Sequence, residues 1–151
     1  MTLLPESRRG WLALAVSLLA ALALLPGCGP RRPPYYGIVA SNESGEPVAG
    51  VRILFGPRVS LAGTDLAPGG YAGDTGLGAP PPEAADVEWQ TADGRRHKER
   101  VPVPAPPLTG YDQHQLYFFF CPGGRVELAW VPMSDPAALR RAVRRATGGG
   151  E

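Results

Sequence analysis

The stretch QLYFFFCPGGRVELAWV, residues 115–131, decides the fold class of this chain. Apolar side chains fill successive positions in 116–120, so both faces of a strand there must be covered, as in a central strand or a covered edge of a core. Pro122-Gly123-Gly124 provides a turn, because proline and glycine supply the backbone angles that tight turns need. Residues 125–131 have the composition of the next strand. We therefore expect two successive β-strands, the first of them buried on both sides.

Short apolar stretches separated by turn residues recur from residue 35 to residue 131. This spacing is typical of an all-β sandwich, and no long helical periodicity competes with it there. The expected strands lie near Tyr36–Ala40, Gly50–Phe55, Val59–Leu61 (the weakest), Ala85–Thr91, Lys98–Val103, Gln115–Cys121 and Arg125–Val131. The sequence predicts a single small antiparallel β-sandwich of about six or seven strands.

The register of the hairpin between residues 85 and 103 can be inferred from side-chain chemistry. A two-residue loop would place Trp89 opposite Lys98 and pair an apolar face with a charged face. A three-residue loop, Ala92–Gly94, with its glycine in the left-handed conformation avoids this mismatch. It places four apolar side chains on one face, those of Val87, Trp89, Val101 and Val103. Because Pro102 and Pro104 cannot donate ladder hydrogen bonds, the second strand should lie at a sheet edge.

Residues 57–83 are rich in glycine and proline and include LAPGGYAGDTGLGAPPP at 66–82. Few apolar groups are present to hold this segment, and no strand pattern follows Tyr71. We expect a loop that is flexible rather than functional. Its glycines do not form a phosphate-binding motif, because Gly76-x-Gly78 is followed by prolines instead of a helix start.

Residues 1–27 have the features of an export signal. Arg8 and Arg9 form a positive region, and an uncharged apolar run extends from Trp11 to Leu25. The run is shorter than the about 20 residues of a comfortable membrane-spanning helix and matches the apolar region of a signal peptide. Leu25-Pro26-Gly27-Cys28 resembles a bacterial lipobox, which implies cleavage between Gly27 and Cys28 and acylation of Cys28. The alternatives are an ordinary secretory signal with an incidental cysteine, and an uncleaved anchor.

Acylation would make Cys28 the membrane anchor of the mature chain. Each buried CH₂ contributes about 0.8 kcal/mol, and a second acyl chain turns marginal binding into stable attachment. Residues 29–34 then form a proline-rich tether that holds the domain within roughly 20 Å of the bilayer. Arg31 and Arg32 either contact anionic headgroups or only solvate the tether. Gly29 resembles the default for outer-membrane sorting, which favours an outer-membrane anchor facing the periplasm over an inner-membrane one.

A C-terminal helix is expected after Ser134, with Asp135 as N-cap and Pro136 at the first helical position. Its apolar face comprises Leu139, Ala142, Val143 and Ala146, and Gly148–Gly150 ends it. Its other face carries four arginines, Arg140, Arg141, Arg144 and Arg145. These arginines either solvate the helix or contact an anionic surface such as membrane phosphates or cell-wall polymer.

Few residues have the type and spacing of an active or metal site. Cys121 ends an apolar strand and is expected to be a buried small hydrophobe, with an intermolecular disulfide or a reactive thiol as the alternative. His97 lies among basic residues that would repel a metal ion, and Asp112 with His114 offers too few ligands. Three aromatic residues could form a sugar-binding platform, but strand positions favour the core for Trp89, Tyr117 and Trp130. We therefore expect no enzyme activity, no cofactor and no metal.

One segment resembles a known family. In GIVASNESGEPVAGVRILFG, residues 37–56, the pattern G-x-V, a polar turn and G-x-P-x-x-G-x-x-[VI] is met by Gly37, Val39, Gly45, Pro47, Gly50 and Ile53. This resembles the first hairpin of carboxypeptidase regulatory-like domains, which are small transthyretin-like β-sandwiches. The segment Asp65–Tyr71 is similar to the turn before the next strand in that family. The resemblance implies a non-catalytic accessory fold.

The expected organisation is a signal peptide at 1–27, a lipidated cysteine and tether at 28–34, a β-sandwich at 35–131, and a helix with a glycine-rich tail at 132–151. Without Arg8, Arg9 and Glu6, the 15 basic and 14 acidic residues of the chain become equal in number, which argues against a nucleic-acid binder. The chain also looks like the small lipoproteins of bacterial envelopes. We expect a non-catalytic binding or structural accessory module with the lipid bilayer and an envelope protein as partners. The alternative is a protective or inhibitory lipoprotein that binds a protein toxin or enzyme.

Overall fold

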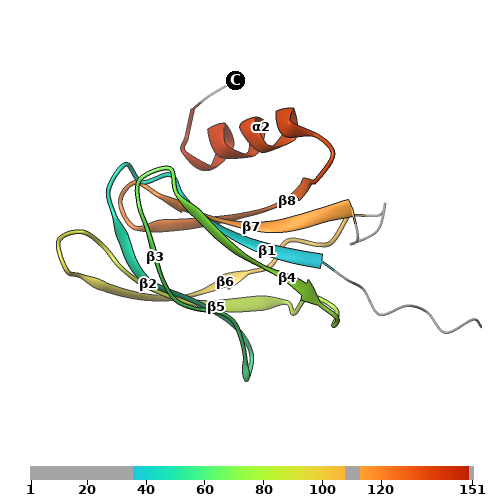
Figure 1. Cartoon of the computed structure of the whole chain (residues 1–151), viewed down its shortest axis with the longest axis horizontal. Coiled ribbons are helices and arrows are strands. Elements are labelled where there is room, and N and C mark those ends of the chain that lie inside the picture. Colours follow the sequence, from blue (N-terminus) through green and yellow to red (C-terminus); the bar gives the residue numbers. More distant parts are fainter. Residues whose placement is uncertain (1–35, 108–112, 150–151) are drawn as a thin grey trace, which may run out of the picture. The chain divides into compact units, whose positions relative to one another are not determined.

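The structure, a computed structural model, describes residues 36–107 and 113–149, and it is an all-β sandwich with one C-terminal helix in this part of the chain (Figure 1). The strands are β1 (Tyr36–Asn42), β2 (Val48–Phe55), β3 (Arg58–Leu66), β4 (Tyr71–Leu77), β5 (Ala84–Gln90), β6 (Arg96–Pro102), β7 (His114–Cys121) and β8 (Arg125–Pro132), and the helix is α2 (Pro136–Ala146). The predicted all-β sandwich is confirmed, with eight strands in the described residues instead of six or seven, and with one parallel pair, β1 and β7, in a fold expected to be antiparallel. The signal peptide, Cys28, the tether and Asp112 lie outside the described residues.

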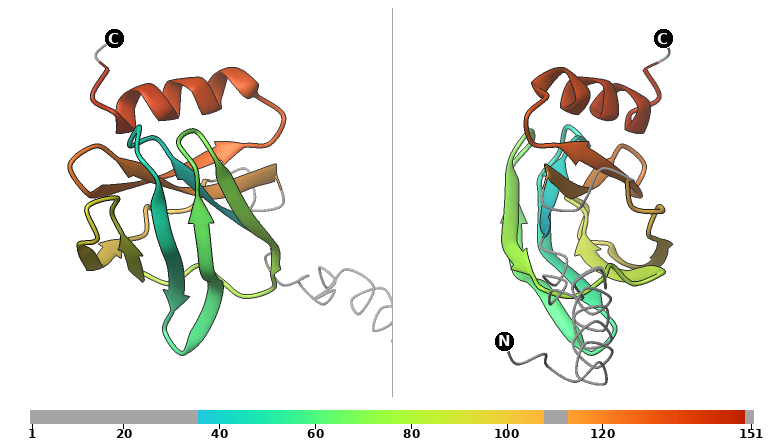
Figure 2. Two further views of the ribbon diagram at one scale, coloured as in Figure 1. Left: turned by 60° about the vertical axis from the view of Figure 1, so that its left-hand side comes forward. Right: turned by 90° about the vertical axis from the view of Figure 1, so that its right-hand side faces the viewer.

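The strands form two four-stranded sheets that pack face to face (Figure 2). One sheet has the order β4-β1-β7-β8 and the other has the order β3-β2-β5-β6. Strands β1 and β7 are parallel, and all other neighbours are antiparallel. The core between the sheets contains fully buried side chains from both, including Ile38, Ile53, Val87, Leu116 and Phe118.

The β7 strand is covered on both faces, as its sequence indicated. Phe118 and Phe120 belong to the core between the sheets, whereas Phe119 and Cys121 belong to a second cluster under α2. Helix α2 contributes Ala142 and Ala146 to that cluster as buried residues. The outer face of the β7–β8 hairpin is therefore buried by the C-terminal helix, which lies over it in Figures 1 and 2.

The predicted register of the β5–β6 hairpin is confirmed. Trp89 pairs with His97 and not with Lys98, and residues 92–94 form the loop. Gly94 has a φ of 82°, the left-handed conformation that this loop requires. Strand β6 lies at the edge of its sheet. Pro102 has no N–H to donate, and a proline is tolerated at an edge because no further strand needs that hydrogen bond.

The expectation of a flexible loop over 57–83 is wrong, because this segment contains β3 and β4. Both are edge strands, so backbone pairing on one side holds each of them, and few apolar side chains are needed. The turn between them is anchored by Asn42, which is fully buried. The Asn42 N–H donates to Gly70 O at 2.9 Å, and the Gly69 N–H donates to Asn42 O at 2.8 Å. The Asn42 Nδ2 also donates to Leu66 O at 3.0 Å.

The expected hairpin over residues 37–56 is also wrong. Strand β1 pairs with β4 and β7, so both of its edges are occupied, and β2 belongs to the other sheet. The turn at 43–47 instead carries the chain from one sheet to the other. The glycine and proline pattern marks a turn correctly without showing which strands pair across it.

The C-terminal helix has the predicted start and end. Asp135 Oδ1 accepts a hydrogen bond from the Ala137 N–H at 2.9 Å, and Pro136 occupies the first turn. After the helix, Gly148 has a φ of 75°, and the Gly149 N–H donates to Arg144 O at 2.9 Å. No helix within the described ranges has the length and apolar character of a membrane span.

Candidate functional site

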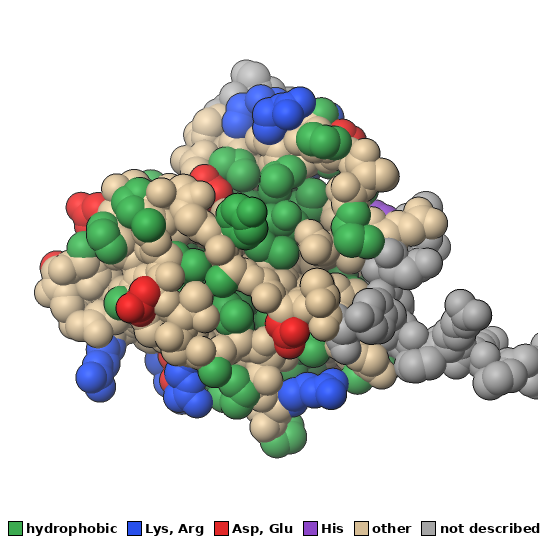
Figure 3. Space-filling view, in the orientation of Figure 1, with side chains coloured by type: hydrophobic (Ala, Val, Ile, Leu, Met, Phe, Trp, Pro, Cys, Tyr) green, Lys and Arg blue, Asp and Glu red, His purple; other side chains and the backbone are tan. Residues whose placement is uncertain are grey.

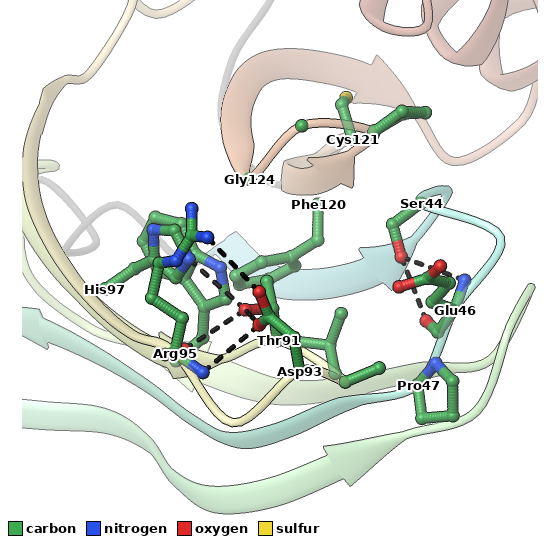
Figure 4. A pocket seen from close by; sticks show the side chains of 15 residues that line it. Ser44, Glu46, Pro47, Thr91, Asp93, Arg95, His97, Phe120, Cys121 and Gly124 are labelled. Atoms are coloured by element: carbon green, nitrogen blue, oxygen red, sulfur yellow. Dashed lines mark hydrogen bonds and ion pairs between the residues drawn. The ribbon is translucent and has the colours of Figure 1, made fainter.

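Three turns meet at one end of the sandwich and enclose an open cleft of about 440 Å³, which we call the loop-end cleft (Figure 4). The turns are those between β1 and β2, between β5 and β6, and between β7 and β8. The lining residues are Ser44, Glu46, Pro47, Val48, Trp89, Thr91, Ala92, Asp93, Arg95, His97, Phe120, Cys121, Pro122, Gly123 and Gly124. Turns at the end of a rigid sandwich are a common position for binding residues.

The floor of the loop-end cleft is aromatic. Trp89 and His97 stack with ring centroids 4.8 Å apart and an angle of 7° between the rings. Phe120 meets Trp89 edge to face, with centroids 5.5 Å apart. Gly124 has a φ of 73°, and a Cβ atom there would lie 2.9 Å from His97 Cε1. The imidazole is therefore held between neighbours, and residue 124 has no room for a side chain.

The rim of the loop-end cleft is fixed by short polar contacts on the β5–β6 side. Thr91 Oγ1 donates to Asp93 Oδ1 at 2.6 Å, and the Arg95 N–H donates to the same oxygen at 3.1 Å. Arg95 Nη2 lies 3.3 Å from Asp93 Oδ2. The Thr91 hydroxyl, followed by the Arg95 N–H, holds the pKa of the Asp93 carboxyl below its usual value. This carboxylate is charged at neutral pH, and each of its two oxygens has a partner within its own turn.

The opposite wall of the loop-end cleft is the β1–β2 turn. Ser44 Oγ donates to Asn42 Oδ1 at 2.7 Å, and it lies 2.9 Å from Glu46 O. The Asn42 Nδ2 donates to Glu46 O at 2.7 Å. The buried asparagine that anchors the β3–β4 turn therefore also shapes this wall. Figure 4 shows Ser44 and Glu46 across the cleft from Thr91 and Asp93.

Cys121 lines the loop-end cleft but is only 1% exposed. Its Sγ lies 3.5 Å from Phe119 O, and burial raises the pKa of the thiol. A protonated, buried thiol is a poor nucleophile and a poor metal ligand. The expectation of a buried small hydrophobe is confirmed.

The aromatic residues considered for a sugar-binding platform do not lie together. Trp89 forms the cleft floor, and Trp130 packs edge to face on Tyr36 in the core, with centroids 5.3 Å apart. Tyr117 stacks on Phe119 under α2, with centroids 5.4 Å apart. Their expected role in packing is confirmed.

Of the two residues considered for an ion, only His114 is described, and it is 8% exposed at the start of β7. His97, which basic neighbours were expected to keep from a metal, is occupied by its stack on Trp89. Within the described ranges, no three side chains of the types His, Cys, Asp and Glu come together in a way that could hold a metal ion.

The basic face of α2, defined as Arg140, Arg141, Arg144 and Arg145, is exposed along its length (Figure 3). Arg141 Nη2 forms an ion pair with Asp135 Oδ2 at 3.0 Å. The other three arginines have no ion-pair partner among the described residues. The structure thus gathers the four arginines on one surface, and contact with an anionic surface stays a prediction.

The loop-end cleft was missed by the sequence analysis. Its three turns were recognisable from their glycines and prolines, and the Trp89 side was correctly aligned by the hairpin register. Their convergence depends on sheet order, because β1 and β2 belong to different sheets. A local pattern carries no information about that order.

The chain matches no protein-family model and no curated protein. Among solved structures it is similar to one described as the NMR structure of the protein from Eubacterium rectale, with a TM-score of 0.44 and 10% sequence identity. The similarity covers 69% of this chain and 94% of that chain.

Proposed function

We propose that this chain is a membrane-anchored, non-catalytic binding module of a bacterial cell envelope, and that it engages an envelope protein through the loop-end cleft. The observation that carries the proposal is the cleft itself, in which three turns of one sandwich enclose an aromatic floor between polar walls. Its volume of about 440 Å³ falls in the range of ligand sites. Because the cleft is open, a side chain or short segment of a partner protein fits it better than an enclosed small molecule.

The loop-end cleft is built in advance of any partner. The Trp89–His97 stack fixes its floor, and the hydrogen bonds of Asp93 and Ser44 fix its two walls. A preorganised surface loses little conformational entropy on binding, which favours affinity. Three side chains that could act as acid, base or nucleophile are held by contacts or buried, namely Asp93, His97 and Cys121, whereas the Glu46 side chain is exposed. These contacts support a binding role over a catalytic one.

The sequence supports the membrane anchor. A lipidated Cys28 followed by the tether at 29–34 would keep the sandwich within roughly 20 Å of the bilayer. Partners would then be proteins at the membrane surface. A protective lipoprotein that captures a soluble toxin or enzyme is the alternative, and the identity of the captured partner distinguishes the two.

Site-specific photocrosslinking in intact envelopes tests the cleft. A photoreactive residue replaces Ala92, an exposed residue of the β5–β6 turn that lines the cleft. The matched control replaces Ala62, an exposed alanine of β3 that does not line it. We expect a defined protein adduct from position 92 and none from position 62. No adduct at position 92, or the same adducts from both positions, would contradict the proposal.

The anchor is tested separately by Cys28→Ala. The wild-type chain should incorporate labelled fatty acid, and the variant should incorporate none. Label that persists in the variant would contradict the lipobox without bearing on the loop-end cleft.

A further inference from the structure

The two sheets have four edges, and three of these carry features that block pairing with another strand. An unprotected edge strand presents unpaired N–H and C=O groups to any other chain. On β6 the edge carries exposed charges and a proline, namely Arg96, Lys98, Arg100 and Pro102. Such charges and prolines are the usual protection of an edge strand. Strand β6 is therefore closed to a second chain.

The edges at β8 and β3 are protected in other ways. Strand β8 begins with the charged residues Arg125 and Glu127 and ends at Pro132. The proline-rich segment after β6 also reaches it, because Trp130 Nε1 donates to Pro104 O at 3.0 Å. Strand β3 pairs with β2 through repeated register shifts, and Gly63 has a φ of 63°. Irregular pairing of this kind disrupts the ladder that a further strand would need.

Strand β4 has fewer of these features, namely one register shift between Tyr36↔Leu77 and Gly37↔Thr75, and one charged residue, Asp74, on the same side of the sheet as Ile38. It contains no proline, lysine or arginine, and it pairs regularly with β1 from Gly37↔Thr75 to Ser41↔Tyr71. Its one charged residue, Asp74, is exposed and has no ion-pair partner within the described ranges. Tyr71 is 78% exposed. From Tyr71 to Thr75 the edge of β4 is thus regularly paired with β1 and apolar in part.

The side chains of β4 alternate in a way that fits a second copy of the same strand. Ser41 of β1 pairs with Tyr71 on one side and with Phe119 on the other, so the three side chains lie on the same face of the sheet. This is the face that α2 covers at Phe119. Gly73 and Thr75 follow on the same face, since side chains alternate along a strand. An antiparallel copy centred on Gly73 would place the ring of Tyr71 opposite Thr75 and beside the bare backbone of Gly73. Aromatic rings commonly cover glycine in this arrangement.

Charge selects the same register. Centring the pair on Asp74 would place two like carboxylates directly opposite each other, which is destabilising. Centring it on Gly73 places Asp74 of one copy opposite Ala72 of the other. The two sheets then continue into each other with their α2 faces on the same side.

We propose that two copies of this chain associate through the free edges of β4, antiparallel and centred on Gly73. The partner is a second copy because the same strand supplies both halves of each contact. Each copy contributes one Tyr71 ring and one Gly73, and each Asp74 faces the Ala72 of the other copy across a two-fold axis. This inference rests on the β4 edge and is independent of the loop-end cleft and of Cys28.

Cysteine crosslinking of the full-length chain in its envelope tests the register. In the proposed pair, residue 71 of one copy faces residue 75 of the other. A chain carrying both Tyr71→Cys and Thr75→Cys should therefore form a disulfide-linked dimer under mild oxidation, seen on a non-reducing gel. Cys121 is 1% exposed and should not compete, and any disulfide through Cys28 would appear equally in the single variant Tyr71→Cys. Co-expression of the two single variants should give the same dimer with one Tyr71 ring still in place, which guards against poor folding of the double variant and against the loss of both rings.

Two controls share the chemistry and differ in geometry. In Tyr71→Cys alone, the two cysteines lie four residues out of register, roughly 13 Å apart along the strand, beyond the reach of a disulfide. The pair Arg96→Cys and Arg100→Cys has the same spacing on β6, at the protected edge. We expect at least tenfold more dimer from the β4 pair than from either control. No dimer from the β4 pair, or equal dimer from a control, would overturn the proposal.

Discussion

The β7–β8 hairpin and the consecutive strands β3 and β4, which belong to different sheets, are held by different forces. Strand β7 is apolar at successive positions and is buried on one face by the core and on the other by α2. Strands β3 and β4 are edge strands with many exposed residues, and the turn between them is bonded to Asn42. The first region is held mainly by side-chain burial, and the second is held mainly by backbone hydrogen bonds and one buried amide, with one core leucine in each strand, Leu66 and Leu77.

This difference determines how each region should respond to mutation. Burial of large apolar side chains contributes several kcal/mol per residue, spread over many contacts. Hydrogen bonds contribute less each, but leaving a buried partner unsatisfied is costly. The β7–β8 hairpin should therefore lose global stability when its side chains are truncated. Strands β3 and β4 should be sensitive at Asn42 and at their two buried leucines, Leu66 and Leu77, and tolerant at their exposed positions.

Phe118→Ala should have the largest effect. Phe118 is fully buried between the sheets and contacts Phe55, with ring centroids 6.3 Å apart. Truncation removes apolar contacts and leaves a cavity, so we expect the free energy of unfolding to fall by about 3–5 kcal/mol. Urea denaturation followed by tryptophan fluorescence measures the loss. Val59→Ala on β3, where the side chain is 47% exposed, should change it by less than about 0.5 kcal/mol. Equal losses from the two variants would show that the regions do not differ as described.

Asn42→Ala should have the next largest effect, because it removes the amide that ties the β3–β4 turn to β1. The Leu66 and Ala67 carbonyls would lose their Nδ2 donor, and we expect a loss of about 1–3 kcal/mol in unfolding free energy. Amide hydrogen exchange should become faster at Gly69, whose N–H donates to Asn42 O.

Ser44→Ala provides the comparison for this variant. The Ser44 hydroxyl lies in the β1–β2 turn and is bonded to Asn42 Oδ1, but it makes no hydrogen bond to the β3–β4 turn. It should leave the exchange rate of Gly69 near that of the wild type. Unchanged protection of Gly69 in Asn42→Ala would mean that the turn is held by something other than the amide.

The two regions also explain which parts of the fold the sequence predicts. The β7 strand is apolar on both faces, and this is a property of its side chains. The residues from Leu116 to Phe120 therefore predict both the strand and the burial of its two faces. The β5–β6 register is readable for the same reason, because Trp89 and Lys98 cannot share a face. Strand β4 is not readable, because its ladder bonds come from the backbone and its residues, such as Gly73 and Asp74, also suit a loop. The anchoring residue, Asn42, lies far away in sequence.

The same limit applies to the loop-end cleft. The turns at Gly94 and Gly123 are predictable from local chemistry, and their left-handed φ values of 82° and 77° confirm them. Their assembly around Trp89 follows from β1 and β2 lying in different sheets, which the pattern at 37–56 does not specify. Long-range sheet order, and not turn chemistry, creates the site.

The smallest effect is expected at the N-cap of α2, the helix that covers the β7–β8 hairpin. The backbone N–H of Ala138, the Arg141 guanidinium and the Ala137 N–H hold the pKa of Asp135 below its ordinary value of 3.8. Because the folded-state pKa is depressed, the stabilisation by this carboxylate is present above pH 3.8 and is lost as the pH falls through the lower folded-state value. Amide chemical shifts of Ala137 and Ala138, followed by NMR, should titrate with that lowered pKa.

Asp135→Asn separates the cap from its charge. An asparagine oxygen can still accept the Ala137 N–H, since Asn is as good an N-cap as Asp. The start of α2 should therefore persist in this variant, while the low-pH titration of the two amides disappears. If both amides titrate as in the wild type, another carboxyl is responsible. If α2 instead melts in Asp135→Asn at neutral pH, the ion pair between Arg141 and Asp135 at 3.0 Å stabilises the helix more than the N-cap hydrogen bond does. The helix that covers the β7–β8 hairpin would then depend on charge as well as on burial.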